Sequence, residues 1–187
     1  MKVIVGLGNP GAEYDDTRHN VGWWLLDRLV YDWGLDTFEK KRRALVTDGL
    51  VGETQVRLIK PTTFMNRSGA ALISLHTIQS FDVQEDLLLV VDDATLEVGR
   101  IRFRASGGSG GHNGLKSVTG ALGTDGYARL RIGVGVCPPG VDLTDWVLGP
   151  LGPNEEDVVI ERINKLEDGV RVWMTEGIEK AMDRSNQ

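Results

Sequence analysis

The chain has 187 residues, 41% of them apolar, and a formal net charge of −6 with acidic and basic residues interspersed. This profile predicts one soluble globular domain over residues 1–187 and excludes a disordered chain. No apolar run approaches the roughly 20 residues of a membrane span, and the first residues do not fit a signal peptide. Cys137 is the single cysteine, which excludes an intrachain disulfide and a cysteine-based zinc site and favours a cytoplasmic protein.

Short β-branched or apolar runs predict six strands. They cover residues 2–7, 44–50, 54–60, 87–92, 99–104 and 129–136. Gly52-Glu53 has the composition of a hairpin connection between the second and third of these strands.

A period of 3.6 residues predicts helices over residues 21–33, 68–80 and 113–122, the first of them with Asn20 as its N-cap. A long C-terminal helix is expected with Asn154 as its cap, and it should pack on the sheet through one apolar stripe. The stripe consists of Val159, Ile163, Leu166, Val170 and Trp173. Because strands and helices alternate, we expect an α/β fold: a single domain with a mixed twisted β-sheet and helices on both faces.

The first glycine-rich motif, Gly6 to Gly11, matches the G-x-G-x-x-G pattern of dinucleotide-binding loops. In such loops a helix begins at once and its N-terminus binds the phosphates. Here a polar stretch reaches to Asn20 before the apolar helix begins, and Pro10 lacks a backbone N–H donor. The motif therefore does not favour a nucleotide cofactor, and no cofactor is expected.

The second glycine-rich segment, Gly107 to Gly111, fits the G-x-S-x-G pattern of serine hydrolases, with Ser109 as nucleophile. His19 and Asp92 could complete a triad, since triads occur in several chain orders. However, a nucleophile elbow is a tight strained turn, and this segment is rich in glycine and loose. A serine esterase using Ser109 is kept as an alternative.

Polar side chains recur where the predicted strands end or the helices begin. They are Asn9, His19, Asn20, Asn66, Asp92 and Asn113. Any one asparagine at such a place is an ordinary cap or turn residue. Because parallel strand ends and helix N-termini meet at one edge of an α/β sheet, the whole set favours a site there.

This set suits hydrolysis of an ester by water. A histidine base has an unperturbed pKa near 6.5, and a carboxylate behind it fixes the tautomer. Such chemistry needs neither a metal nor a covalent nucleophile. His112 neighbours the site and ranks second as a functional histidine.

Two predicted strands carry alternating arginines, Arg100, Arg102 and Arg104 on one and Arg129 and Arg131 on the other. A period of two places each set on one face of its strand. This is common on a solvated sheet face, but arginine is also well suited to bind phosphate. The neighbouring glycine loop favours phosphate contact modestly.

Four segments together resemble the bacterial-type peptidyl-tRNA hydrolase family over nearly the whole chain. They are residues Val5 to Gly22, Pro61 to Gly69, Gly110 to Ser117 and Arg129 to Gly135. The resemblance implies a single α/β domain and a cytoplasmic monomer that hydrolyses the ester between a peptide and the 3′ ribose of tRNA. The partner would be tRNA, without a membrane, metal or cofactor.

The resemblance also implies roles for individual residues. His19 would activate water, Asp92 would orient it, and Asn9 would help to sense the acylated amino group of the substrate. Asn66 and Asn113 would hold the peptide and the tRNA 3′ end. Tyr14 and Phe64 would line that cleft, and Arg104 and Arg131 would bind the tRNA 5′ phosphate.

The carboxylate partner of His19 is open between two neighbours. Counting back from Gly99 favours Asp92, whereas counting forward from Asn66 favours Asp93. Adjacent strand residues face opposite sides, so only one of them can contact His19. We choose Asp92. An RNA-binding module of the same fold without turnover is the remaining alternative function.

Overall fold

One seven-stranded sheet forms the centre of the protein, for which a computed structural model describes residues 1–186. The strand order is β2-β3-β4-β1-β5-β7-β6. The strands are β1 (Lys2–Gly6), β2 (Glu39–Lys41), β3 (Ala44–Val51), β4 (Thr54–Pro61), β5 (Leu87–Asp93), β6 (Ile101–Arg104) and β7 (Ala128–Gly133). Strands β4, β1, β5 and β7 are parallel, and β2, β3 and β6 join antiparallel.

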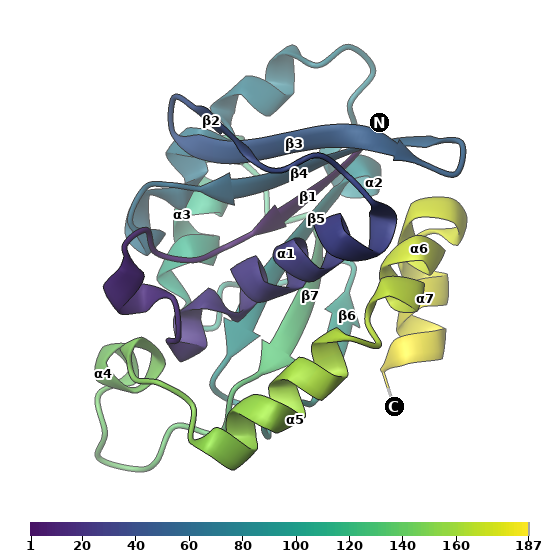
Figure 1. Ribbon diagram of the computed structural model, residues 1–187. Coiled ribbons are helices and arrows are strands. Elements are labelled where there is room, and N and C mark those ends of the chain that lie inside the picture. The colour runs from purple at the N-terminus through teal and green to yellow at the C-terminus, as the bar shows by residue number, and fades with distance from the viewer. Residues whose placement is uncertain (187) are drawn as a thin grey trace.

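Helices cover both faces of this sheet (Figure 1). They are α1 (Val21–Trp33), α2 (Val83–Asp86), α3 (Asn113–Leu122), α4 (Leu143–Leu148), α5 (Pro153–Ile163), α6 (Glu167–Glu176) and α7 (Ile178–Ser185). One apolar core joins α1, α5 and α6 to the sheet, and a second joins α3 and the segment around Leu72 and Leu75 to the other face. The predicted α/β fold with a mixed sheet is confirmed.

The predicted hairpin is also present. Val51 pairs with Thr54 across Gly52-Glu53, and Gly52 has a φ of 62°, in the left-handed region that glycine tolerates. Helices α1 and α3 have the predicted bounds. Asn20 stands at the N-cap position of α1, but its side chain makes no capping hydrogen bond.

The expected helix over residues 68–80 is instead two 3-10 helices, η3 (Met65–Ala71) and η4 (Ile73–Thr77). Hydroxyl groups reinforce these tighter turns, since Ser68 donates to the carbonyl of Met65 at 2.8 Å and Thr77 to that of Ser74 at 2.7 Å. Such local bonds compete with the regular α-helical pattern.

The expected long C-terminal helix is three helices, α5 to α7. The first begins at Pro153, so its N-cap is Gly152 and not Asn154. The N–H of Gly152 donates to Glu155 at 2.9 Å. The first break follows Ile163, at the end of α5. The second lies at Gly177, between α6 and α7, where φ is 89°. The predicted apolar stripe nevertheless holds, because all five of its side chains are buried in the core.

The parallel strands all end at the edge of the sheet where α4 lies, at the left of Figure 1. The loop after β1 leads into η1 (Ala12–Tyr14) and η2 (Arg18–Asn20), the 3-10 turn that carries His19. A glycine-rich loop leads from β6 to α3, and α3 begins at the same edge as His19. Within residues 1–186, no helix has the length and apolar composition to cross a membrane.

Candidate active site

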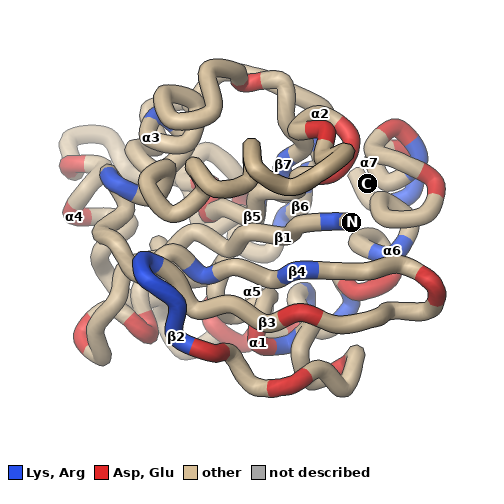
Figure 2. The backbone as a smooth tube through the Cα atoms, turned by 90° about the horizontal axis from the view of Figure 1, so that it is seen from above, with Lys and Arg blue, Asp and Glu red and all other residues tan. Residues whose placement is uncertain are grey.

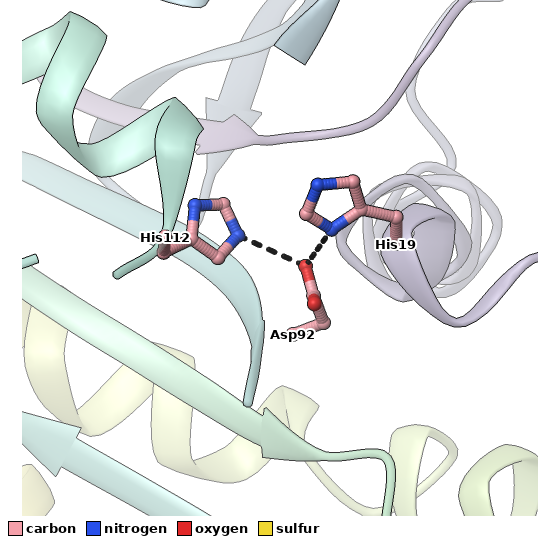
Figure 3. A group of neighbouring side chains, drawn as sticks. All are labelled: His19, Asp92 and His112. Carbon is pink, nitrogen blue, oxygen red and sulfur yellow. Dashed lines mark hydrogen bonds and ion pairs between the residues drawn. The ribbon is translucent and has the colours of Figure 1, made fainter. Parts of the chain in front are cut away.

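Two histidines share one buried carboxylate at the carboxyl end of β5 (Figure 3). The distance from His19 Nδ1 to Asp92 Oδ1 is 2.7 Å, and that from His112 Nε2 to the same oxygen is 2.9 Å. His19 comes from η2, Asp92 from β5, and His112 from the residue before α3. The structure thus brings together groups from three separate parts of the chain.

The hydrogen bonds assign the protons on both imidazoles. His112 Nδ1 accepts from the backbone N–H groups of Gly114 and Leu115 at 3.1 and 3.2 Å, so its proton lies on Nε2 and is donated to Asp92. This also caps α3. His19 donates its Nδ1 proton to Asp92, which leaves the lone pair of Nε2 free to accept a proton from water.

The carboxylate is 3% exposed and His19 is 8% exposed, so the contact is largely shielded from solvent. Burial lowers the pKa of His19, but the charge of Asp92 and the hydrogen bond to it outweigh burial and raise that pKa. Burial raises the pKa of Asp92, but its interactions with the two imidazoles outweigh burial and hold the pKa well below its usual range. Asp92 therefore stays ionised and His19 is a stronger base.

The neighbouring carboxylate, Asp93, points away from His19. Its Oδ1 accepts from the backbone N–H and the hydroxyl of Thr95, at 2.9 and 2.7 Å. Its Oδ2 lies 3.0 Å from Nε of Arg131. Strand alternation thus places Asp92, the residue chosen from the sequence, against His19, and gives Asp93 the role of an ion-pair and turn residue.

Asn9 lies in the loop after β1 and is held from three directions. Asn20 accepts from its backbone N–H at 2.8 Å and donates to its carbonyl at 3.0 Å. The side-chain Oδ1 of Asn9 accepts from the backbone N–H of Met65 at 2.8 Å. The amide NH2 of Asn9 has no hydrogen bond within residues 1–186, so it is a fixed and available donor. The side chain of Asn20 therefore fixes the backbone of Asn9.

A small cavity of about 90 Å³ lies beside the two histidines. Its walls include Asn113, Arg131 and Ser109, together with Leu143 and Val147 of α4. A more open hollow of about 670 Å³ lies among α5, α6 and α7, lined by paired surface charges and without a histidine. The smaller cavity is the one with chemical groups for hydrolysis.

The other expected site residues do not line this cavity. Tyr14 and Phe64 form an edge-to-face ring pair with centroids 6.4 Å apart, and Phe64 is 57% exposed. Asn66 is exposed on η3, next to the Met65 N–H that orients Asn9. Arg104 is exposed on β6 and does not line the cavity.

The two arginine sets share one face of the sheet, because Arg102 pairs with Arg131 and Arg104 with Arg129. Arg129 is buried and donates to the carbonyls of Gly107 and Asp125, so it secures the glycine loop and is not available to a ligand. Arg131 reaches the cavity wall.

Arg18 has a structural role that the sequence reasoning did not identify. Its guanidinium donates to the carbonyls of Val134 and Pro150 at 3.2 and 2.6 Å and lies 3.3 Å from Glu155. It also stacks on Trp146 of α4, 3.8 Å from the ring centroid. Arg18 thus ties the turn carrying His19 to α4 and α5. Its position next to His19 was the only signal in the sequence.

The geometry does not assemble a serine triad. Ser109 lines the cavity, but its hydroxyl has no hydrogen bond to a histidine in the described chain. Both nitrogens of His112 are already engaged, so His112 has no lone pair left to activate that hydroxyl.

The ligand atoms of His19, Asp92 and His112 lie within 4.8 Å of one another, a spacing that a metal ion could use. A metal there would displace the protons that both imidazoles donate to Asp92. The hydrogen-bonded network already satisfies these atoms. That the reaction needs no metal stays a prediction.

The chain is similar to known proteins over nearly its whole length. The family model for peptidyl-tRNA hydrolase matches residues 3–187. A peptidyl-tRNA hydrolase of Gemmatimonas aurantiaca is 43% identical over 185 residues, covering 97% of each chain, and one of Agathobacter rectalis is 40% identical over the full length of both. The crystal structure of the Acinetobacter baumannii peptidyl-tRNA hydrolase matches with a TM-score of 0.86 and 32% identity, covering 100% of this chain and 94% of that one. The chain belongs to the peptidyl-tRNA hydrolase family.

Proposed function

We propose that residues 1–187 act as one peptidyl-tRNA hydrolase domain, which cleaves the ester between a peptide and the 3′ ribose of tRNA. The product is free tRNA, recycled from prematurely released peptidyl-tRNA. The observation that carries this proposal is the His19–Asp92 contact of 2.7 Å, with Nε2 of His19 left free beside the cavity. The domain works as a cytoplasmic monomer without a metal or cofactor.

In the proposed reaction, His19 is the base and water is the nucleophile. Nε2 of His19 takes a proton as the water oxygen attacks the ester carbonyl, and Asp92 stabilises the imidazolium that forms. The proton then passes to the 3′ oxygen of the ribose as the ester bond breaks. No covalent bond to the protein forms in this sequence.

Asn9 supplies the preference for an acylated substrate. Its Oδ1 is occupied by the Met65 N–H, so its NH2 group can donate to a carbonyl oxygen of a peptide. Aminoacyl-tRNA has an ammonium group instead, which cannot accept that bond and leaves a donor facing a cation. In this proposal Asn66 and Asn113 offer further amides to the peptide and the tRNA 3′ end. The paired rings of Tyr14 and Phe64 give the peptide an apolar surface to pack against.

Arg104 and Arg131 bind the 5′ phosphate of the tRNA in this proposal. They lie on the same face of paired strands, and guanidinium forks suit phosphate oxygens. Removal of the 5′ phosphate should slow the native enzyme and hardly affect Arg131→Ala. Equal slowing of both would refute the assignment.

The deciding experiment is release of tRNA from N-acetyl-aminoacyl-tRNA by the pure protein, by His19→Ala and by Ser109→Ala. His19→Ala should lose about 10²–10⁴ in rate, and Ser109→Ala should stay active. An inactive Ser109→Ala variant would favour the serine esterase. No cleavage by the native protein, with tight tRNA binding, would favour an RNA-binding module without turnover.

A further inference from the structure

Four consecutive basic residues, Lys40 to Arg43, span the end of β2 and the turn into β3, on a protein whose net charge is −6. All four are exposed. Lys41 pairs with Glu39 at 2.6 Å, whereas Lys40, Arg42 and Arg43 have no ion pair with residues 1–186. We call Lys40, Arg42 and Arg43 the basic turn; Figure 2 shows it as a blue bend beside β2.

The basic turn lies at the same edge of the sheet as the histidines. Ala44, directly after the turn, pairs with Pro61 at the end of β4. The N–H of Thr62 donates to the carbonyl of Arg43 at 2.8 Å, which fixes the turn to the segment leading to Phe64 and Met65. The turn is therefore tied to the segment of Phe64, which the proposed function places along the peptide.

The strand order separates the turn from the arginines of the proposed phosphate site. Arg104 and Arg131 lie on β6 and β7, and the order continues through β5 and β1 to β4 and β3. If the RNA lies over β6 and β7 and the ester lies beside His19, the peptide leaves on the other side, over β1 and β4. The basic turn stands at the end of that path.

We propose that the basic turn selects peptidyl-tRNAs whose peptide carries acidic side chains a few residues from the ester. This inference rests on the proposed function. Strands are about 4.8 Å apart, so the turn lies on the order of 10 Å across the sheet from β1. An extended peptide spans that distance in about three to five residues, at roughly 3.3–3.6 Å each.

The loop after β1 refines the expected position of the acidic residues. Glu13, Asp15 and Asp16 are exposed on that loop, next to Tyr14. Acidic residues of the peptide directly beside the ester would face these carboxylates, so they would add no attraction between substrate and enzyme. Attraction is expected only for acidic residues placed further along the peptide, within reach of Arg42 and Arg43.

The test compares N-acetylated pentapeptidyl-tRNAs that share the tRNA and the residue at the ester, with Glu or Lys at positions three to five from the ester. At low salt the native enzyme should show a kcat/KM about 3- to 10-fold higher for the Glu substrate, and this ratio should approach one at about 1 M salt. Lys40→Ala, Arg42→Ala and Arg43→Ala combined should remove the preference.

The control variant combines Lys165→Ala, Lys180→Ala and Arg184→Ala, which changes the net charge equally on exposed residues at the α6–α7 side. It should keep the preference. Cleavage of N-acetyl-aminoacyl-tRNA, measured in parallel, reports the proposed function separately. If the basic-turn variant slows all substrates equally, the turn contacts RNA and the proposal is wrong. If the basic-turn variant changes only solubility, the basic residues merely protect the edge strand β2 from pairing with other chains, and the proposal is also wrong.

Discussion

Replacing Asp92 with asparagine removes the negative charge that the two histidines share and should leave the imidazolium of His19 without its counter-charge. The asparagine oxygen can still accept from His112 Nε2, whose proton is fixed because His112 Nδ1 caps α3. Both histidines contact the same Oδ1 of Asp92, so this oxygen can also still accept from His19 Nδ1. The proton on His19 stays on Nδ1, but the neutral amide stabilises the imidazolium that forms in the reaction much less than the carboxylate does.

The expected loss is about 10²–10⁴ in kcat, which corresponds to about 3–5 kcal/mol of transition-state stabilisation. The assay is release of tRNA from N-acetyl-aminoacyl-tRNA under single-turnover conditions. Asp93→Asn is the matched control, because Asp93 contacts Thr95 and Arg131 and not His19. A folded Asp92→Asn variant within threefold of the native rate would refute the charge argument, as would a larger loss in Asp93→Asn.

Three further predictions concern the pH–rate profile, the contacts of Arg18 and two glycines. The rate should fall as pH falls through the raised pKa of His19. In Asp92→Asn the inflection of the pH–rate profile should move to lower pH, because the neutral amide no longer offsets the effect of burial on that pKa. An unmoved inflection would contradict this. Arg18→Ala should lower the free energy of unfolding, measured in urea, by about 1–3 kcal/mol, and Arg18→Lys should lie between Arg18→Ala and the native protein. An unchanged midpoint of urea unfolding would show that the contacts of Arg18 contribute nothing. Gly69→Ala should lower the free energy of unfolding by about 1–3 kcal/mol, because its Cβ would collide with the carbonyl oxygen of Ser117. Gly120→Ala, on the open face of α3, should raise that free energy by about 0.4–1 kcal/mol. Equal melting temperatures of the two variants would refute the packing argument.

The strands with apolar periodicity and the helices α1 and α3 could be predicted from the sequence because their burial pattern dictates them. Strand β2 could not, since Glu39 to Lys41 are polar and exposed and pair only at the sheet edge. The C-terminal stripe predicted the buried side chains but not the breaks, because apolar spacing is insensitive to a short turn between helices.

The site was predictable in its residues and less so in its contacts. His19 and Asp92 were expected together, and their 2.7 Å contact bears this out. His112 was ranked second, because the sequence does not reveal that it both caps α3 and donates to Asp92. Asn20 was expected to cap a helix and instead binds Asn9, a contact across eleven residues that depends on the path of the loop.

The central claim is that His19 supplies the base, and His19→Asn tests it most directly. The asparagine can still donate a hydrogen bond to Asp92, but it cannot take a proton from water at neutral pH. With enzyme in excess over N-acetyl-aminoacyl-tRNA, the rate of tRNA release should drop by about 10²–10⁴ while tRNA binding is retained. Release within threefold of the native rate would contradict the account.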